Sequence, residues 1–518
     1  MIKIKHILTS VALATLLASC NQEVEKDYVD YVNPYIGNIS HLLVPTFPTV
    51  QLPNSMLRVY PDRGDYTSER VNGLPIIVTN HRERSAFNLT PYQGEELRPV
   101  RSYTYDNEKI TPYSFEIELD DNNMAAQYAL SHQSAIYNIE FRQTDKPVYV
   151  MVNTRDGEMH ADAKAISGYQ DLGNNTKIYL YIEPEQAPVQ TGILEKGKVE
   201  EGKKDAQGRN ACAVWRFADG TKQVNLRYGV SFISAEQAKN NLYREQTDYN
   251  VAALAAKGRD VWNKTLARID VKGGTEDEKT VLYSSYYRTF ERPICMSEDG
   301  RYFSAFDGKV HEDNGTPFYT DDWIWDTYRA AHPLRLLIDQ KIEEDIIDSY
   351  LRMAEQMGNM WMPTFPEVSG DSRRMNSNHA VVTVADALAK GLKVDVAKAY
   401  EACRKGIEEK TLAPWSSAPA GWIDQFYREH GYIPALQEGE EETDPNVTPW
   451  EKRQPIAVTL GTAYDQWCLH LLASALGKKE EAAYYLNCAR NYRNVFRPET
   501  AFFHPKDKDG NWIEPFDY

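Results

Sequence analysis

The spacing of the apolar residues changes once along the chain, near residue 235, and this change limits the possible folds most strongly. Before it, apolar and polar residues alternate, as in the segment 113–119, where Tyr, Phe, Ile and Leu alternate with Ser and Glu. After it, apolar residues recur three or four positions apart, as in the segment 342–357. A period of two indicates half-buried antiparallel strands, and a period near 3.6 indicates amphipathic helices. The sequence therefore predicts strands in the first half and helices in the second.

The predicted elements divide the chain into regions. A chain of 518 residues is too long for one ordinary domain. Residues 21–235 are predicted to form an N-terminal antiparallel β-sandwich, because Asn, Asp and Gly separate their short strand-like runs. Residues 236–278, rich in Ala, Leu, Lys and Arg, are predicted to be a helical linker between domains. Residues 279–518 are predicted to form a helical domain, with helices near 342–357, 378–391, 394–407, 456–477 and 480–496.

Residues 1–20 have the features of a targeting segment. A basic start precedes an apolar stretch at 7–17, and residues 17–20 read Leu-Ala-Ser-Cys. That ending is similar to a bacterial lipobox. It predicts cleavage before Cys20, a lipid attached to Cys20, and export to the outer membrane, on its periplasmic face or at the cell surface. The alternative is an ordinary cleaved signal in which Cys20 is incidental. No other stretch approaches the roughly 20 apolar residues that a spanning helix needs.

Charge and cysteine content exclude other classes. The formal net charge is −17, which argues against nucleic acid as a partner because such binding depends on neutralising phosphates. No Gly-rich phosphate loop, zinc spacing, HExxH or GxSxG motif is found. Five cysteines follow Cys20 at wide spacing, and we expect mostly buried thiols while one disulfide stays possible. These cysteines are Cys212, Cys295, Cys403, Cys468 and Cys488.

The candidate site is the segment 320–329, which reads Thr-Asp-Asp-Trp-Ile-Trp-Asp-Thr-Tyr-Arg. Thr320 or Asp321 can cap a helix whose first turn carries Asp322, and Asp326 then falls four residues later on the same face. Carboxylates serve as acids, bases or acceptors for sugar hydroxyls. The alternative is that Asp321 only caps the helix and that Asp322 only favours its positive end.

Asp326 is harder to explain as a purely structural residue. It lies past the predicted cap and ahead of an apolar run through Leu337 that we expect to be buried, so it needs a partner or a ligand. Trp323 and Trp325 beside it offer flat faces of the kind that a sugar ring packs against. The alternative for both indoles is a place in the core.

Taken together, these residues resemble glycoside hydrolase family 92, the calcium-dependent exo-acting α-mannosidases. The resemblance is carried by short motifs in a fixed order over nearly the whole chain. They include Trp-Asp-Thr-Tyr-Arg at 325–329, His-Ala at 379–380 and Ala-Tyr-Asp-Gln-Trp at 463–467. Further motifs lie at 31–37, 269–274, 297–302 and 496–516.

The resemblance implies a β-sandwich, a helical linker and an (α/α)6 barrel. It also implies inverting hydrolysis of terminal α-mannosyl residues of N-glycans or mannans, by a protein that is a monomer when complete. Asp326 is then expected to accept hydrogen bonds from the terminal sugar, with Trp325 beside it. His379 is a weaker candidate for substrate binding, because a satisfied histidine at a helix start explains it equally well. Calcium is implied, but its ligands cannot be placed.

The chain departs from the family pattern in two places that matter here. Gly461 stands where the family usually has Glu in its Ala-Tyr-Asp motif. The family's general acid and base follow a Glu-Pro-Phe-Asp motif, which here occupies 514–517 and is followed only by Tyr518. No catalytic carboxylate is therefore assigned, and the barrel is expected to be incomplete, with residues 21–518 inactive alone and poorly folded as a monomer. The alternative functions are a non-catalytic surface glycan-binding lipoprotein and a degenerate relative.

Overall fold

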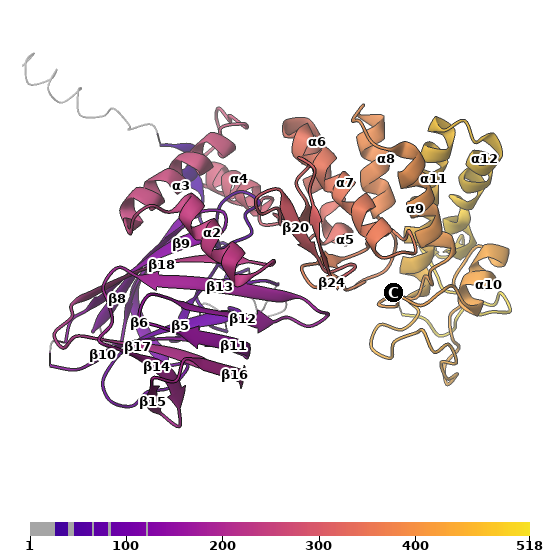
Figure 1. Ribbon diagram of the computed structural model, residues 1–518. Helices are drawn as coiled ribbons and strands as arrows, with labels where there is room; N and C mark the ends of the chain where they lie inside the picture. Colours follow the sequence, from indigo (N-terminus) through magenta and orange to yellow (C-terminus); the bar gives the residue numbers. More distant parts are fainter. Residues whose placement is uncertain are drawn as a thin grey trace, which may run out of the picture.

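The computed structural model describes residues 26–39, 46–64, 67–80, 84–120, 123–143 and 145–517. The predicted signal at 1–20, including Cys20, lies outside these residues. Figure 1 shows the strands gathered in the first half of the chain and the helices in the second. The change of apolar period near residue 235 thus coincides with the change from β18 (Gln223–Ser231) to α2 (Ala235–Glu245).

The described strands of the first half form two large antiparallel sheets. The ten-stranded sheet has the order β16 (Asp205–Arg209), β11 (Asp156–Ala161), β12 (Ile166–Asp171), β13 (Lys177–Pro184), β18, β9 (Ser134–Phe141), β8 (Met124–Leu130), β7 (Ser114–Leu119), β6 (Ser102–Ile110), β3 (Arg70–Asn72). The six-stranded sheet has the order β15 (Lys198–Glu201), β14 (Gln190–Glu195), β17 (Cys212–Phe217), β10 (Val148–Thr154), β5 (Phe87–Gln93), β4 (Leu74–Pro75). A short pair, β1 (Val50–Gln51) and β2 (Arg58–Val59), joins the sandwich to the helical half.

The core of the sandwich contains several large aromatic side chains whose polar atoms are bonded. The hydroxyls of Tyr128 and Tyr228 lie 3.0 Å apart, and Tyr228 donates to the carbonyl of Ile76 at 2.7 Å. The indole of Trp215 donates to the carbonyl of Asp162 at 2.8 Å. A buried Tyr or Trp stabilises a core when its polar atom finds a partner. The predicted alternation is confirmed in β7, where every second residue is buried.

The predicted helical stretch after residue 235 is two helices, α2 and α3 (Val251–Leu266), and not one. Gln246 is extended between them, and Asn250 caps α3 by accepting from Ala253 N at 2.9 Å. Both helices pack on the outer face of the ten-stranded sheet (Figure 1). A third helix, α4 (Glu276–Arg288), begins with a capping box and leads into the second half.

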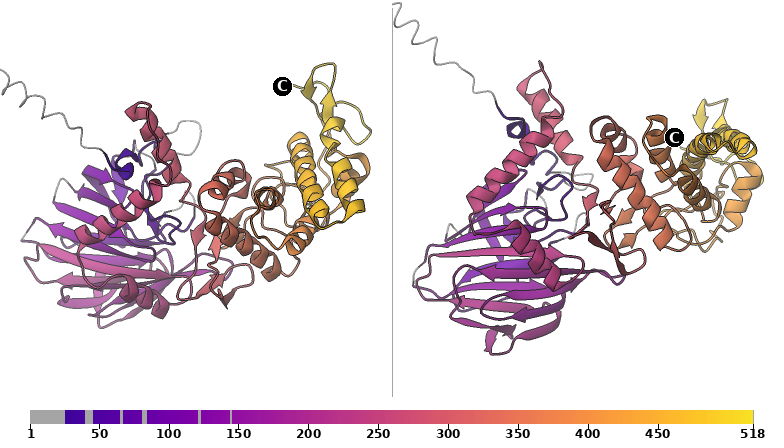
Figure 2. Two further views of the ribbon diagram at one scale, coloured as in Figure 1. Left: turned by 90° about the horizontal axis from the view of Figure 1, so that it is seen from above. Right: turned by 45° about the horizontal axis from the view of Figure 1, so that its top comes forward.

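The later helices stand in pairs, side by side in one row (Figure 2). Helices α6, α8 and α11 are neighbours in one layer, and each packs on a partner behind it, α7, α9 and α12. Two helices were not expected from the sequence as separate elements, the short α5 and α10. The helices are α5 (Ile324–Thr327), α6 (Ala331–Ile338), α7 (Gln340–Gln356), α8 (Ala380–Ala389), α9 (Val396–Glu408), α10 (Trp422–His430), α11 (Pro455–Ala475) and α12 (Lys479–Cys488).

Short strand pairs connect these helices and shape the loops between them. They are β19 (Ile294–Cys295) with β22 (Tyr319–Thr320), β20 (Arg301–Ser304) with β21 (Lys309–Glu312), β23 (Pro366–Glu367) with β24 (Gly370–Asp371), and β25 (Phe496–Arg497) with β26 (Phe502–Phe503). The predicted fold class is confirmed: an antiparallel sandwich comes first, and α/α pairs follow it.

One continuous core joins the two halves. The indole of Trp262 in α3 donates to the carbonyl of Gln51 at 2.7 Å. The side chain of Asn54 donates to the carbonyl of Pro293, also at 2.7 Å. These buried bonds cross long sequence separations, so the halves pack as one body and a site between them is held from both sides.

The cysteines are thiols, as expected. Cys212, Cys403 and Cys468 are buried, Cys295 and Cys488 are half-buried, and all five are free in the described part of the chain. Among these five cysteines no disulfide is formed. Within the same part, no helix has both the length and the hydropathy that crossing a membrane requires.

Candidate functional site

The segment 320–329 lies where the helical half meets the sandwich. Thr320 belongs to β22, which pairs with β19, and Asp321 has a left-handed backbone with φ of 62°. Helix α5 begins only at Ile324, and within the described residues no side chain caps it. The prediction that Thr320 or Asp321 caps a helix carrying Asp322 in its first turn is wrong, because strand pairing holds the chain extended up to residue 320.

Asp321 is instead a buried ion-pair partner. Its Oδ2 lies 2.5 Å from Nη2 of Arg58 in β2 and 3.3 Å from Nε of Arg292. The exposed fractions of the Arg58 and Asp321 side chains are 3% and 0%. A buried carboxylate needs such charged donors to offset the loss of water. Asp321 therefore ties the site segment to the sandwich.

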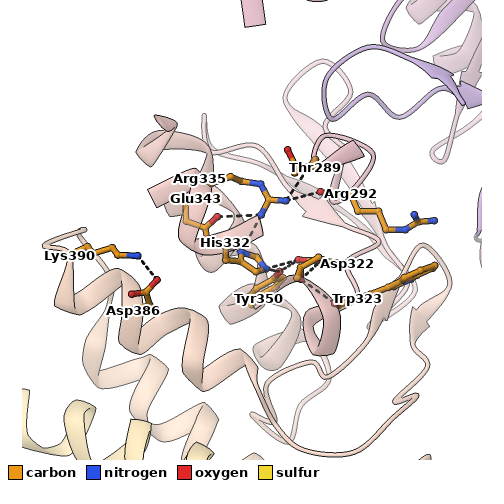
Figure 3. A network of polar contacts seen from close by, with 11 residues as sticks. Thr289, Arg292, Asp322, Trp323, His332, Arg335, Glu343, Tyr350, Asp386 and Lys390 are labelled. Atoms are coloured by element: carbon orange, nitrogen blue, oxygen red, sulfur yellow. Dashed lines mark hydrogen bonds and ion pairs between the residues drawn. The ribbon is translucent and has the colours of Figure 1, made fainter. Parts of the chain in front are cut away.

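Asp322 is the first member of a buried network (Figure 3). Its carboxylate accepts from Nε2 of His332 at 2.9 Å, from the hydroxyl of Thr327 at 2.8 Å, and from the hydroxyl of Tyr350. Nδ1 of His332 lies 2.7 Å from Oε1 of Glu343 in α7. Asp322 thus plays no part at a helix end, and the structural alternative considered for it is also wrong.

The charged groups in this network shift each other's pKa. Burial alone raises the pKa of Asp322, but the facing charges of His332 and Arg335 and the bonds from His332 and Tyr350 lower it well below its ordinary value. Burial alone lowers the pKa of His332, but Glu343 and Asp322 raise it to about 9. At neutral pH, His332 is therefore an imidazolium between two carboxylates.

Asp326 is exposed, which corrects the expectation of burial for it and for the apolar run that follows. In α6 only one side is buried, and Leu337 is 73% exposed. Neighbouring atoms still desolvate the Asp326 carboxylate enough to raise its pKa, although the charges of Arg329 and Arg292 oppose this and Asp322 adds to it. The carboxylate is thus open to a ligand and faces two cations.

The two indoles are half-buried and each carries a guanidinium. Arg292 lies over Trp323 at 4.1 Å, and Arg329 lies over Trp325 at 4.3 Å. Phe365 also stacks on Trp323, at a centroid distance of 5.5 Å. Cation–π contact of this kind holds an arginine in place. The indoles therefore orient the arginines around Asp326, in addition to any contact they make with a sugar.

His379 is buried at the start of α8. Its Nδ1 lies 2.7 Å from Oδ1 of Asp465, whose other oxygen accepts from the backbone N of Asn378 at 2.7 Å. Its ring lies against Tyr328, with 4.2 Å between centroids. One nitrogen is thus satisfied within the fold, as in the structural alternative. Tyr328 connects the imidazole to the segment that carries Asp326.

Sequence reasoning missed the charged residues of the network, His332, Arg335 and Glu343, and also Arg58, Arg292 and Glu367. Glu367 lies on β23, is buried, and pairs with Arg374 at 3.1 Å. Its pKa is raised by burial and by the charge of Asp321, against the opposing charge of Arg374. The neighbouring Pro366 accepts from Asp322 N at 2.9 Å. The acidic, Pro-rich stretch at 361–367 was the available signal.

The described residues identify no ligands for the calcium that the family resemblance implies. Within them, no group of three or more His, Cys, Asp and Glu side chains is placed to hold a metal ion. Oxygen ligands from several residues are what Ca²⁺ requires. The carboxylates around Asp326 are engaged by arginines and histidine, so no step of the chemistry below is derived through a metal.

Residues 31–231 match the N-terminal domain of glycosyl hydrolase family 92, and residues 237–518 match its catalytic domain. An inverting mannosidase of family GH92 from Bacteroides thetaiotaomicron VPI-5482 has the same fold. It is 28% identical, with a TM-score of 0.84 over 96% of this chain and 69% of that chain.

Two further relatives are more distant. An α-mannosidase of family GH92 from Bacteroides thetaiotaomicron is 23% identical, with a TM-score of 0.82 over 95% of this chain and 69% of that chain, and shows likeness of fold. A secreted glycosidase of Arthroderma benhamiae, itself uncharacterised, is 22% identical over 579 residues, which cover 97% of this chain and 68% of that protein.

A sandwich packed through one core onto α/α helix pairs, with a carboxylate site at the junction, defines this protein as a glycoside hydrolase. Because the two domain matches together span most of the sequence, the chain belongs to glycosyl hydrolase family 92.

Proposed function

We propose that the protein is an exo-acting α-mannosidase that hydrolyses terminal α-mannosyl residues of N-glycans or mannans with inversion. The family match over both halves, together with the likeness to an inverting mannosidase, carries the proposal. Asp326 binds hydroxyls of the terminal sugar, because it is an exposed carboxylate at the junction and the charges of Arg329 and Arg292 act on it. Trp325 supports it, and His379, whose ring lies against Tyr328, is a second contact.

The proposal also includes the organisation of the chain. Residues 21–235 act as the sandwich domain, 236–278 as the helical linker, and 279–518 as the helical catalytic domain. The reacting acid and base are assigned to no residue of this sequence. The lipid on Cys20 anchors the exported protein to the outer membrane, and a calcium requirement is carried over from the family alone.

Binding and hydrolysis test the function together. Mannoimidazole, a planar analogue of mannose, resembles the flattened transition state of glycoside hydrolysis. We expect it to bind at least a hundredfold more tightly than mannose by titration calorimetry, because a catalytic pocket prefers the transition state. Incubation with an aryl α-mannoside is followed by NMR with calcium present, and any turnover by an inverting enzyme should release β-mannose first.

Asp326→Ala should weaken mannoimidazole binding well over tenfold, since hydrogen bonds to a charged group contribute about 1.5–3 kcal/mol. The matched control is Asp386→Ala in α8, because Asp386 forms a partly exposed pair with Lys390 at 2.7 Å and should leave affinity unchanged. Equal, weak affinity for mannose and mannoimidazole would support the non-catalytic glycan-binding alternative. Absence of binding to both would overturn the proposal, whereas turnover would overturn only the expected inactivity of residues 21–518.

The lipid anchor has its own measurement. Mass spectrometry of the protein purified from membranes should find a diacylated or triacylated Cys20 at the mature N-terminus. Cys20→Ala should move the protein to the soluble fraction. A mature chain that begins elsewhere contradicts the anchor and leaves the enzymatic proposal untouched.

A further inference from the structure

We propose that the buried chain of Asp322, His332 and Glu343 is a positioning device for sugar binding, in which His332 holds both the Asp326 turn and Arg292 in place. This inference rests on the proposed role of Asp326. Figure 3 shows the imidazole between the two carboxylates, with Arg335 and Tyr350 beside them. The three members come from the segment before α5, from α6 and from α7.

One arm of the device holds the turn that carries Asp326. Helix α5 has only four residues, Ile324–Thr327. A single helical turn is not stable by itself in water, because its nucleation is unfavourable. Thr327, which directly follows Asp326, donates its hydroxyl proton to Asp322 at 2.8 Å. His332 in turn fixes Asp322 through a hydrogen bond of 2.9 Å. The orientation of Asp326 therefore depends on the imidazole through two successive hydrogen bonds.

The second arm holds Arg292. Oε2 of Glu343 lies 3.5 Å from Nη1 of Arg335. Nη2 of Arg335 donates to the carbonyl of Arg292 at 2.7 Å and to that of Thr289 at 3.3 Å. The guanidinium of Arg292 then lies over Trp323 and beside Asp321. Glu343 therefore connects the imidazole to the backbone of one of the two arginines that face Asp326.

His332 suits this place because it can donate from both ring nitrogens. A neutral imidazole has one N–H, so one of the two carboxylates would lose its donor. The side chains of Asp322 and Glu343 are 0% exposed, and each unpaired buried charge is strongly unfavourable. The raised pKa of His332 agrees with a permanent cation. Arg335 and Tyr350 also face the ring, at 3.3 Å from Nδ1 and 3.4 Å from Nε2.

Loss of the His332 cation should raise the pH at which Asp326 is protonated. The charged groups that act on its carboxylate are Arg329, Asp322 and Arg292. With His332 removed, the charge of Asp322 is no longer balanced, and the turn between Asp322 and Thr327 loosens. Asp326 should then be protonated at higher pH, so sugar affinity should begin to fall at higher pH than in the wild type.

The test compares His332→Gln with His311→Gln. His311 pairs with Asp307 at 3.0 Å on the β20–β21 hairpin, away from the chain of Asp322 and Glu343. In His332→Gln, we expect affinity for mannoimidazole to fall at least tenfold at pH 7. We also expect the acid limb, which is the fall of affinity on acidification, to move to higher pH by at least half a unit. In His311→Gln neither should change. An unchanged acid limb in folded His332→Gln overturns the inference.

Amide hydrogen exchange provides a readout that needs no ligand. The amides of Asp326 and Thr327 donate to the carbonyl of Trp323 at 2.7 and 2.9 Å, and that of Tyr328 donates to Ile324 at 3.1 Å. His332→Gln should speed their exchange at least tenfold while α8 stays protected. Unchanged exchange at these amides contradicts the positioning role, whatever the ligand data show.

A double variant covers the case in which His332→Gln does not fold. Asp322→Asn with His332→Gln removes the unbalanced charge and keeps an acceptor for Thr327. We expect it to fold, to have the wild-type acid limb and to keep fast exchange at Asp326. If the wild type does not bind mannoimidazole while the exchange result holds, the proposed function fails and the positioning of the turn stands.

Discussion

Arg58 in the sandwich half donates to Oδ2 of Asp321 in the helical half, and the two atoms are 2.5 Å apart. The pair joins residues 263 positions apart in the sequence and is almost completely buried. Arg292 approaches the same oxygen from a third segment. This buried carboxylate therefore helps the continuous core to hold the candidate site against the sandwich.

Arg58→Met should destabilise the protein by about 3 kcal/mol, which is at the lower end of the range for breaking a buried ion pair. The loss is no larger because Arg292 still neutralises Asp321 in part. Denaturation in urea measures the loss. The control is Arg142→Met, since Arg142 pairs with Glu118 at the surface and should contribute less than about 1 kcal/mol. Equal effects of the two substitutions would show that the buried pair has no special weight.

Glu298 should make stability fall as the pH rises. It is 0% exposed and accepts from Phe232 N at 2.9 Å and from Asn241 at 2.7 Å. Burial raises its pKa to about 7, so the folded state holds a proton that the unfolded state releases above pH 4.5. The contribution of this proton to the free energy of unfolding is on the order of 3 kcal/mol. It is fully present below pH 4.5 and is lost by about pH 7.

Glu298→Gln removes this titration. The free energy of unfolding of the variant, minus that of the wild type, should therefore rise between pH 4.5 and pH 7 and level off above it. Glu236→Gln provides the control for the substitution itself, because the Glu236 side chain is exposed at the surface. A flat difference for Glu298→Gln would mean that the carboxyl is ionised in the folded protein at all these values.

Two glycines should respond to alanine in opposite directions. A Cβ at Gly229 in β18 would lie 2.1 Å from the carbonyl oxygen of Ala238 in α2, and backbone atoms cannot swing aside. Gly229→Ala should therefore lose at least about 2 kcal/mol. Gly406 in α9 has no neighbour closer than 3.6 Å to such an atom among the described residues, so Gly406→Ala should gain about 0.5–1 kcal/mol. Thermal unfolding decides both.

Trp325→Phe should change sugar affinity far less than Asp326→Ala. A phenyl ring keeps an aromatic face for Arg329, which lies 4.3 Å above the indole, and it leaves the carboxylate of Asp326 in place. We expect less than a threefold loss of mannoimidazole affinity by calorimetry. A loss as large as that of Asp326→Ala would instead assign Trp325 a direct contact with the sugar.

The sequence by itself determined the elements whose patterns are local. Alternation identified β7, and the 3.6-residue period identified α7, because each pattern records which side of one element is buried. Motif order identified the family and singled out Asp326. It did not show that Asp326 is exposed, since exposure depends on what other segments cover.

Only the tertiary structure decided the environment of the site. Thr320 and Asp321 resemble a helix cap locally, but pairing with β19 holds Thr320 in a strand. Asp322 resembles a first-turn carboxylate, but His332 from α6 neutralises it inside the core. Arg58 reaches Asp321 from another domain. Hydrogen bonds and ion pairs between distant segments leave no periodic trace in a sequence, because a charge has the same local pattern whether its partner is water or a buried side chain.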